Sequence, residues 1–118
     1  MAYDEFLADR VRNILRAKRA DADEKKMFGG LCFLVDEKMC VGVEGDRLMV
    51  RIDPDAYEDA LERPGTREMK FTGKPMKGFV FVEVEGTKSA ASLQSWVQMA
   101  LDFNPKAKAS KSRKAKTY

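Results

Sequence analysis

The chain has 118 residues, the length of one ordinary domain and enough to bury a hydrophobic core. Hydrophobic residues make up 44% and charged residues 35% of it, a balance typical of folded, soluble proteins. No apolar run approaches the ~20 residues that span a bilayer, and the N-terminus lacks the pattern of a signal peptide. We therefore expect a cytoplasmic protein.

Histidine is absent from the chain and cysteine is rare. The chain has no histidine, which removes the usual general base near neutral pH and the commonest metal ligand. Its two cysteines, Cys32 and Cys40, form no Cys-x-x-Cys pair and are too few for the disulfide framework of a small secreted domain. We expect reduced thiols, no metal, no cofactor and no enzymatic activity.

The net charge of +3 is unevenly distributed along the chain. Of the 22 basic residues, six follow Pro105 with no acidic residue among them, so residues 1–104 carry 16 basic against 19 acidic side chains. This pattern predicts a folded domain over 1–104 and a basic, disordered tail over 105–118. The candidate nucleic-acid contacts of the tail are Lys106, Lys108, Lys111, Arg113, Lys114 and Lys116.

A solvated, solubilising tail is the simpler interpretation of those charges. Tyr118 is the only aromatic residue of the segment, so it lacks the interleaved stacking residues typical of nucleic-acid-binding arms. Both interpretations remain open from the sequence.

Helical periodicity opens the chain. Apolar residues at i, i+3 and i+4 spacing between residues 3 and 19 predict an amphipathic helix. Three segments with alternating apolar residues follow, at 31–35, 39–43 and 48–52. The short polar separators between them favour an antiparallel meander of three strands.

The second half of the chain predicts two helices and two strands. Asp53 and Pro54 have the residue types of a helix N-cap and first helical position. Strands are expected over 67–72 and 79–85, separated by the turn-like segment 73–78. A last amphipathic helix is predicted from Ser89 to Asn104. The order helix, three strands, helix, two strands, helix indicates an α+β fold.

Several short segments of the sequence resemble the TfoX N-terminal domain family. Met27-Phe28-Gly29-Gly30 is similar to the signature that opens the first strand of these domains, and Leu48-Met49-Val50-Arg51 resembles their third strand. Phe71-Thr72-Gly73 resembles their next turn, and Pro75-Met76-Lys77-Gly78 the entry to their last strand. The combination is far more specific than any single tetrapeptide.

The resemblance implies a two-layer α-β(3)-α-β(2)-α sandwich with an antiparallel sheet, of the secretion-chaperone-like type. The best-known members, called TfoX or Sxy, are positive regulators of bacterial competence genes and carry a second domain, for which this chain is expected to lack room. The resemblance implies no catalytic residues. It implies a non-enzymatic regulatory module, such as a transcriptional co-regulator, that acts through protein contacts. The alternative is an accessory protein that binds nucleic acid through the basic tail.

The paired glycines Gly29 and Gly30 lack the remainder of any phosphate-binding motif. A bulge or bend in a long first strand accounts for them more simply than a ligand loop, with Met27 and Phe28 as core residues beside the bend. The acidic residues between 53 and 59 are likewise explained by capping of a helix start.

The predicted strands are apolar on both sides, which is unusual for a sheet with one solvated face. A cover is therefore expected over the second face, in the form of further helices, a second copy in a homodimer, or a partner protein. A three-residue turn at 36–38 would place both cysteines on that face, whereas a two-residue turn changes the parity. The candidate interface residues are Cys32, Leu34, Cys40, Met49, Phe79 and Phe81.

Overall fold

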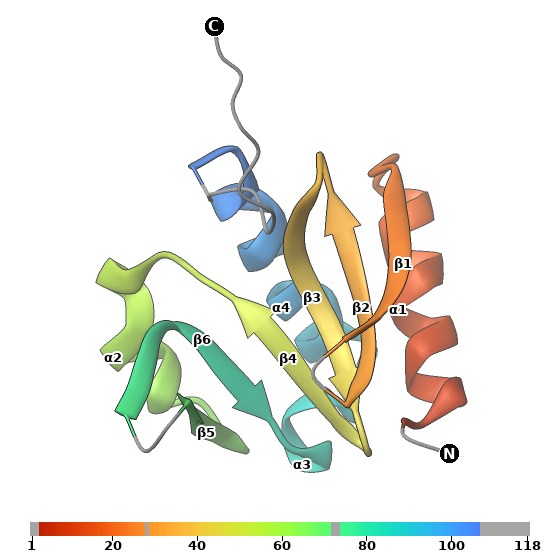
Figure 1. The fold of residues 1–118 in the computed structure, drawn as a ribbon. Coiled ribbons are helices and arrows are strands. Elements are labelled where there is room, and N and C mark those ends of the chain that lie inside the picture. Colours follow the sequence, from red (N-terminus) through yellow and green to blue (C-terminus); the bar gives the residue numbers. More distant parts are fainter. Residues whose placement is uncertain (1–2, 28, 72–73, 107–118) are drawn as a thin grey trace, which may run out of the picture.

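The computed structural model describes residues 3–27, 29–71 and 74–106, with the backbone alone at 70–77 (Figure 1). Its helices are α1 (Glu5–Ala17), α2 (Tyr57–Leu61), α3 (Val84–Thr87) and α4 (Ala90–Phe103), with single 3-10 turns η1 (Pro54–Ala56) and η2 (Asn104–Lys106). Its strands are β1 (Ala22–Met27), β2 (Gly30–Val35), β3 (Lys38–Glu44), β4 (Arg47–Arg51), β5 (Thr66–Phe71) and β6 (Lys74–Val82). No helix in these ranges is long and apolar enough to cross a membrane.

The predicted helix starts are confirmed by their caps. The side chain of Asp53 accepts a hydrogen bond of 2.9 Å from the backbone N–H of Asp55, and that of Ser89 accepts one of 3.0 Å from Ser92. Each cap satisfies a backbone donor that the first turn of a helix leaves unpaired. The sequence therefore placed these two boundaries correctly.

The sheet is antiparallel throughout and has six strands in the order β1-β2-β3-β4-β6-β5. The sequence predicted five, because β1 has no alternation of apolar and polar residues. Four of its six residues are charged, and its central side chains are exposed. As an edge strand it pairs only with β2, and charges on such an edge oppose pairing with another molecule. The α+β fold with a two-layer arrangement is confirmed, with this strand added.

The prediction of a bend in a long first strand at Gly29 and Gly30 is wrong. Met27 pairs with Gly30, so a hairpin turn joins β1 to β2 at this point. Gly29 has a φ of 75°, which favours glycine, and a Cβ atom on Gly30 would lie 2.1 Å from the carbonyl oxygen of Val43. Phe28 lies outside the described residues.

The expected boundaries in the β5–β6 hairpin also change. The segment 73–78 was expected to separate two strands, yet β6 begins at Lys74 and contains Pro75, Met76, Lys77 and Gly78. Lys70 pairs with Pro75 close to the start of β6, and Thr72 and Gly73 lie outside the described residues. The strand ends at Val82, and the short helix α3 occupies the end of the segment expected to continue it.

The turn between β2 and β3 has two residues, Asp36 and Glu37, whose φ values of 54° and 65° are those of a tight hairpin turn. Three residues were expected. Val35 therefore pairs directly with Lys38, which shifts the start of β3 by one position relative to the prediction.

A β-bulge at Cys40 compensates for this shift. Leu34 pairs with Met39 but Phe33 pairs with Val41, so Cys40 is an extra residue on β3. Met39 and Cys40 consequently exchange faces relative to the prediction, while Val41 and the residues beyond it keep their expected faces. Cys40 packs in the helix-side core and Met39 on the opposite face.

Helices α1, α2 and α4 cover one face of the sheet and share a single core with it (Figure 1). Trp96 of α4 and Phe33 of β2 are the largest fully buried side chains in this core, with 1% and 0% of their surface exposed. Tyr57 of α2 and Val11 of α1 belong to the same core. The opposite face of the sheet has no helix packed on it among the described residues.

Replacing Gly30 with alanine should destabilise the fold by about 2–4 kcal/mol, because the new methyl group meets the backbone of β3 and one strand must move. Gly78→Ala is the matched control, since a Cβ there meets only an ordinary contact of 3.7 Å with the carbonyl oxygen of Ile52. Urea unfolding followed by the fluorescence of the single Trp96 measures both. Equal midpoints for the two variants would contradict the close approach at Gly30.

Candidate functional site on the helix-free sheet face

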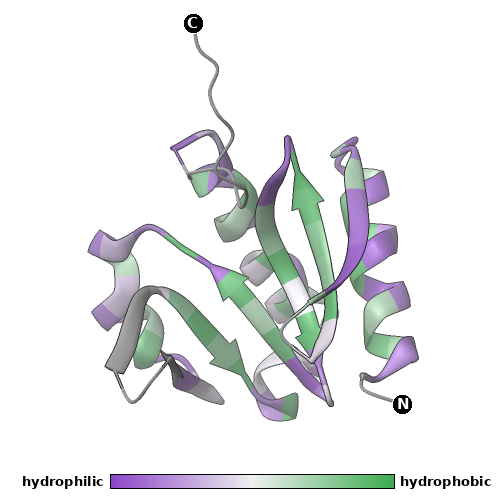
Figure 2. Cartoon of the chain, in the orientation of Figure 1, coloured by the Kyte–Doolittle hydropathy of each residue, from purple (hydrophilic) through white to green (hydrophobic). Residues whose placement is uncertain are grey.

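The sheet face opposite α1, α2 and α4 is called the helix-free face below. Figure 2 shows its inner strands β2, β3, β4 and β6 as largely hydrophobic, whereas the edge strand β1 is hydrophilic. Its apolar centre, called the methionine cluster, consists of Cys32, Leu34, Met39, Met49 and Met69. The partly buried residues packed against this cluster are Met27, Phe79 and Phe81.

The methionine cluster is buried within the single chain. Met49 and Cys32 are each 0% exposed, and Met39 is 2% exposed. A Cβ atom on Gly42 would lie 2.7 Å from Cε of Met49 and 3.2 Å from Sγ of Cys32, so these two side chains pack over the glycine. Methionine suits such a gap because its unbranched side chain adapts to irregular space. The centre of this face is therefore covered largely within the chain.

Two arginine–phenylalanine stacks lie beside this centre. The guanidinium carbon of Arg47 lies 3.7 Å from the ring centroid of Phe81, and that of Arg51 lies 5.3 Å from the ring of Phe79. These distances are within the range of favourable cation–π contacts. Because Arg51 pairs with Phe79 across β4 and β6, all four groups face the same side of the sheet.

The charges around the stacks are held in place by ion pairs. Arg47 lies 2.6 Å from a carboxylate oxygen of Glu44 and 3.6 Å from one of Glu83. Arg67 of β5 lies 4.0 Å from Glu83, but 65% of its side-chain surface is exposed. Burial lowers the pKa of Arg51, although an arginine stays charged at neutral pH. The rim of the face therefore combines flat aromatic and guanidinium groups with the well-exposed cation of Arg67.

The two predicted interface cysteines lie on opposite faces. Cys32 belongs to the methionine cluster, whereas the bulge places Cys40 among the residues beneath the helices. Burial raises the pKa of Cys32 to about 11 and that of Cys40 to about 12. Both thiols are protonated near neutral pH, which makes them poor nucleophiles and metal ligands. Of the predicted interface set, Cys40 alone leaves the helix-free face.

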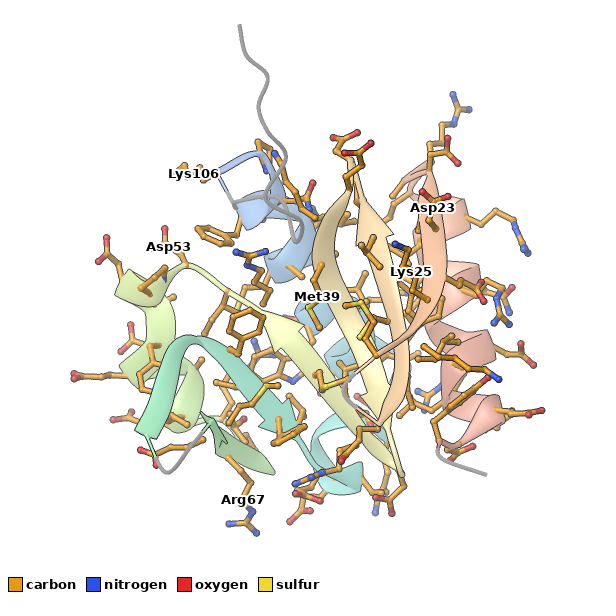
Figure 3. The ribbon with its side chains drawn as sticks, viewed as in Figure 1. Asp23, Lys25, Met39, Asp53, Arg67 and Lys106 are labelled. Carbon is orange, nitrogen blue, oxygen red and sulfur yellow. The ribbon has the colours of Figure 1, made fainter. Side chains whose placement is uncertain are left out.

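Of the six predicted nucleic-acid contacts in the tail, only Lys106 lies among the described residues. Lys106 is exposed in η2, and the other five basic residues of the tail lie outside the described residues. Lys38 donates hydrogen bonds from Nζ to the carbonyl oxygens of Asn104 and Pro105, at 3.2 and 3.4 Å. Figure 3 shows Lys106 and Arg67 at opposite ends of the molecule. The start of the tail is thus fixed to β3, far from the exposed arginine of the helix-free face.

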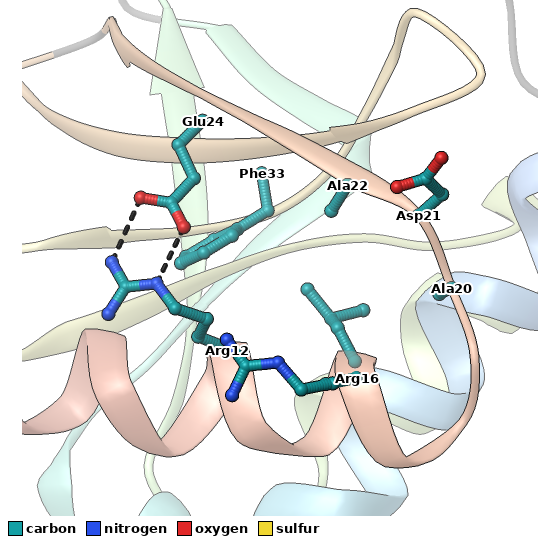
Figure 4. A pocket seen from close by; sticks show the side chains of 8 residues that line it. Arg12, Arg16, Ala20, Asp21, Ala22, Glu24 and Phe33 are labelled. Carbon is teal, nitrogen blue, oxygen red and sulfur yellow. Dashed lines mark hydrogen bonds and ion pairs between the residues drawn. The ribbon is translucent and has the colours of Figure 1, made fainter.

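A pocket of about 210 Å³ lies on the other side of the sheet, between α1 and β1 (Figure 4). Arg12 of α1 and Glu24 of β1 form a two-point ion pair beside it, with N–O distances of 2.6 and 2.9 Å. The hydrogen bond from Arg12 is the main cause that lowers the pKa of Glu24. Since Arg12 and Glu24 bond to each other across it, this pocket is interpreted as a seam that ties the edge strand to the helix.

In the described ranges, no group of three or more His, Cys, Asp or Glu side chains could hold a metal ion.

The residues that the sequence missed are Arg47 and Arg67, together with Glu44 and Glu83. Their positions beside the phenylalanines become clear only once β4, β5 and β6 are paired, because the segments are far apart in the chain.

The stability of the protein should fall as the pH rises from about 8 to about 10. In the unfolded chain both thiols ionise near pH 8.5–9, whereas the folded pKa values are about 11 and about 12, so the folded state holds more protons in this window. Each thiol should contribute a loss of about 1–2 kcal/mol. Urea midpoints measured across the window in wild type and in the Cys32→Ala, Cys40→Ala double variant check this. An equal slope in both proteins would contradict it.

Comparison with known proteins places the chain in a family. A search among curated proteins gives no match. A crystal structure of a protein from Pseudomonas syringae, a structural genomics target, is similar with a TM-score of 0.56 and 11% identity, over 82% of this chain and 97% of that one. At this identity the similarity concerns the fold alone. The TfoX N-terminal domain matches residues 15–104. Because that match spans most of the sequence, the chain belongs to the TfoX N-terminal domain family.

Proposed function

We propose that this chain is a non-enzymatic regulatory module that acts by binding another macromolecule on its helix-free face. The observation that carries the proposal is the asymmetry of the sheet: all the packed helices lie on one face, and the other presents Phe79 and Phe81 with arginines stacked on them. A sheet face with this composition and no helix over it is a typical interaction surface.

Membership of the TfoX N-terminal domain family supports a role in transcription, as a co-regulator of the competence type. Such a role requires binding of a partner macromolecule and does not require catalysis. The thiols, which would be the strongest nucleophiles of the chain, are buried and protonated, in agreement with a binding function.

The expected occupants of the face included a second copy of the chain, packed sheet to sheet, or a partner protein. The centre of the face offers little area to either, because the methionine cluster is already at most 6% exposed in a single chain. A partner would therefore contact the rim, where Arg67 is well exposed and the two phenylalanines are partly exposed.

A complementation experiment tests the regulatory role. Deleting the gene from its native cell should change the transcript levels of a defined set of genes, and the wild-type protein should restore them. Arg67→Glu should not restore them, because it reverses the exposed charge of the helix-free face. Arg16→Glu, a charge reversal at an exposed position on α1, is the matched control and should behave as wild type.

Unchanged transcripts after the deletion would refute the regulatory role. Full restoration by Arg67→Glu would place the working surface elsewhere on the molecule. Circular dichroism of both variants establishes that they are folded.

A second candidate function is nucleic-acid binding by the tail, favoured by six basic residues after Pro105 with no acidic residue among them. If all six neutralise phosphates of duplex DNA, log K against log salt should have a slope of about −5. Changing the basic residues of the tail to glutamine in the full chain should abolish that slope. Titrations at several salt concentrations measure it, and a slope that survives the change would refute the tail as the binding element.

A further inference from the structure

The sequence of β6 contains a pattern that the function proposed above does not use. Lys77-Gly78-Phe79-Val80-Phe81-Val82 follows the RNP1 pattern of RNA-recognition sheets, which reads Lys or Arg, Gly, aromatic, small, Phe, Val, any residue, aromatic. It departs from the pattern at Val80, where a small residue is usual, and at Val84, where an aromatic is usual. In that motif the two aromatic residues project from one sheet face and stack on bases.

In the structure this pattern lies on an inner strand of the sheet, with both aromatic residues on one face. β6 is an inner strand, paired with β4 on one side and β5 on the other. Phe79 and Phe81 both lie on the helix-free face and are partly exposed, while Val80 and Val82 are 0% exposed beneath the helices. A short sequence match alone is weak evidence, but here the two aromatic rings stand on an antiparallel sheet whose opposite face carries the helices.

The stacked arginine Arg47 covers the ring of Phe81 with a second flat group. Arg47 lies 3.7 Å from the centroid of the Phe81 ring, and Glu44 and Glu83 hold its guanidinium group there. Nucleic-acid bases stack on guanidinium planes as well as on aromatic rings. Glu83 lies 3.6 Å from Arg47 and 4.0 Å from Arg67, so a phosphate would approach the exposed guanidinium group of Arg67 from the side away from that acid.

Exposed cations on two strands of this face can pair with phosphates, and Asp23 of β1, which pairs with Leu34, is an acid on the same face. Arg67 pairs with Phe81 across β5 and β6, so the exposed guanidinium group stands beside that ring. On the other side of the methionine cluster, Lys25 of β1 faces the same way, because it pairs with Cys32. Figure 3 shows Lys25 and Arg67 on either side of this face.

The spacing of the rings favours a single strand. Two residues along a β-strand span about 7 Å, which is about twice the 3.4 Å rise of stacked bases in a duplex. Successive bases reach both rings only when the strand is unstacked and extended. A duplex keeps its base faces inside the helix and cannot stack on either ring.

We infer that the helix-free face binds single-stranded nucleic acid, with bases stacked on Phe79 and on the Arg47 guanidinium group that lies over Phe81, and with phosphates near Arg67. The inference rests on the proposed function, because it uses the same face and names the chemical class of its ligand. RNA and DNA share the bases and phosphates that this surface contacts, so both are included.

Fluorescence anisotropy of the full chain with labelled oligo(U) and oligo(dT) of about ten nucleotides tests the inference at physiological salt. Both single strands should bind more tightly than a duplex of equal length. Phe79→Leu and Phe81→Leu should each weaken binding about tenfold, because they keep apolar bulk but lose the stacking ring. Phe81→Tyr should bind as wild type, and Phe6→Leu, at an aromatic residue that is 72% exposed on α1, is the matched control.

A full-length variant with the basic residues after Lys106 changed to glutamine separates the face from the tail, and it should keep the sensitivity to Phe79→Leu. Binding that is lost in the tail variant but unchanged by both leucine variants would overturn the inference. No binding of either single strand would also overturn it, as would light scattering that shows a dimer in which Arg67→Glu dissociates the two copies. If neither single strand binds but Arg67→Glu still fails to restore the transcripts, the proposed function holds and its partner is a protein.

Discussion

The burial of one sheet face beneath α1, α2 and α4 is the constraint on which the rest of the structure depends. Trp96 and Phe33 are both buried in this core, and burying a side chain of such size stabilises the fold by about 2–3 kcal/mol. Because all the packed helices are used on this side, the second face of the sheet must satisfy its own apolar residues. It does so with the methionine cluster, whose flexible side chains close over Gly42.

The bulge at Cys40 reconciles a tight turn with this two-sided burial. A two-residue turn alone would reverse the facing of every later residue on β3 and place Val41 and Val43 on the wrong side. The extra residue restores their positions beneath the helices, and Cys40 itself is left without a partner in the pairing of β2 with β3. The same step moves Met39 into the methionine cluster and Cys40 out of it. The composition of both faces thus depends on one local irregularity.

The helix-free face combines a buried centre with an accessible rim. Its most apolar side chains are hidden in the single chain, while the accessible groups are aromatic rings, guanidinium groups and the charges of β1. Flat polar and aromatic groups recognise partners with flat faces, and exposed charges on an edge strand discourage strand-to-strand pairing. The match to the TfoX N-terminal domain gives the family, and the helix-free face is the surface on which the proposed binding function depends.

The sequence by itself determined the helix boundaries at Asp53 and Ser89, the α+β class, the family, and an apolar second face, because caps and alternating residues act through near neighbours in the chain. Only the tertiary structure decided the edge strand β1, whose charged residues carry no periodic signal and which is a strand because β2 pairs with it. It also decided the face of Cys40 and the stacking of Arg47 on Phe81. These features depend on register between segments distant in the chain, which no local pattern of residues fixes.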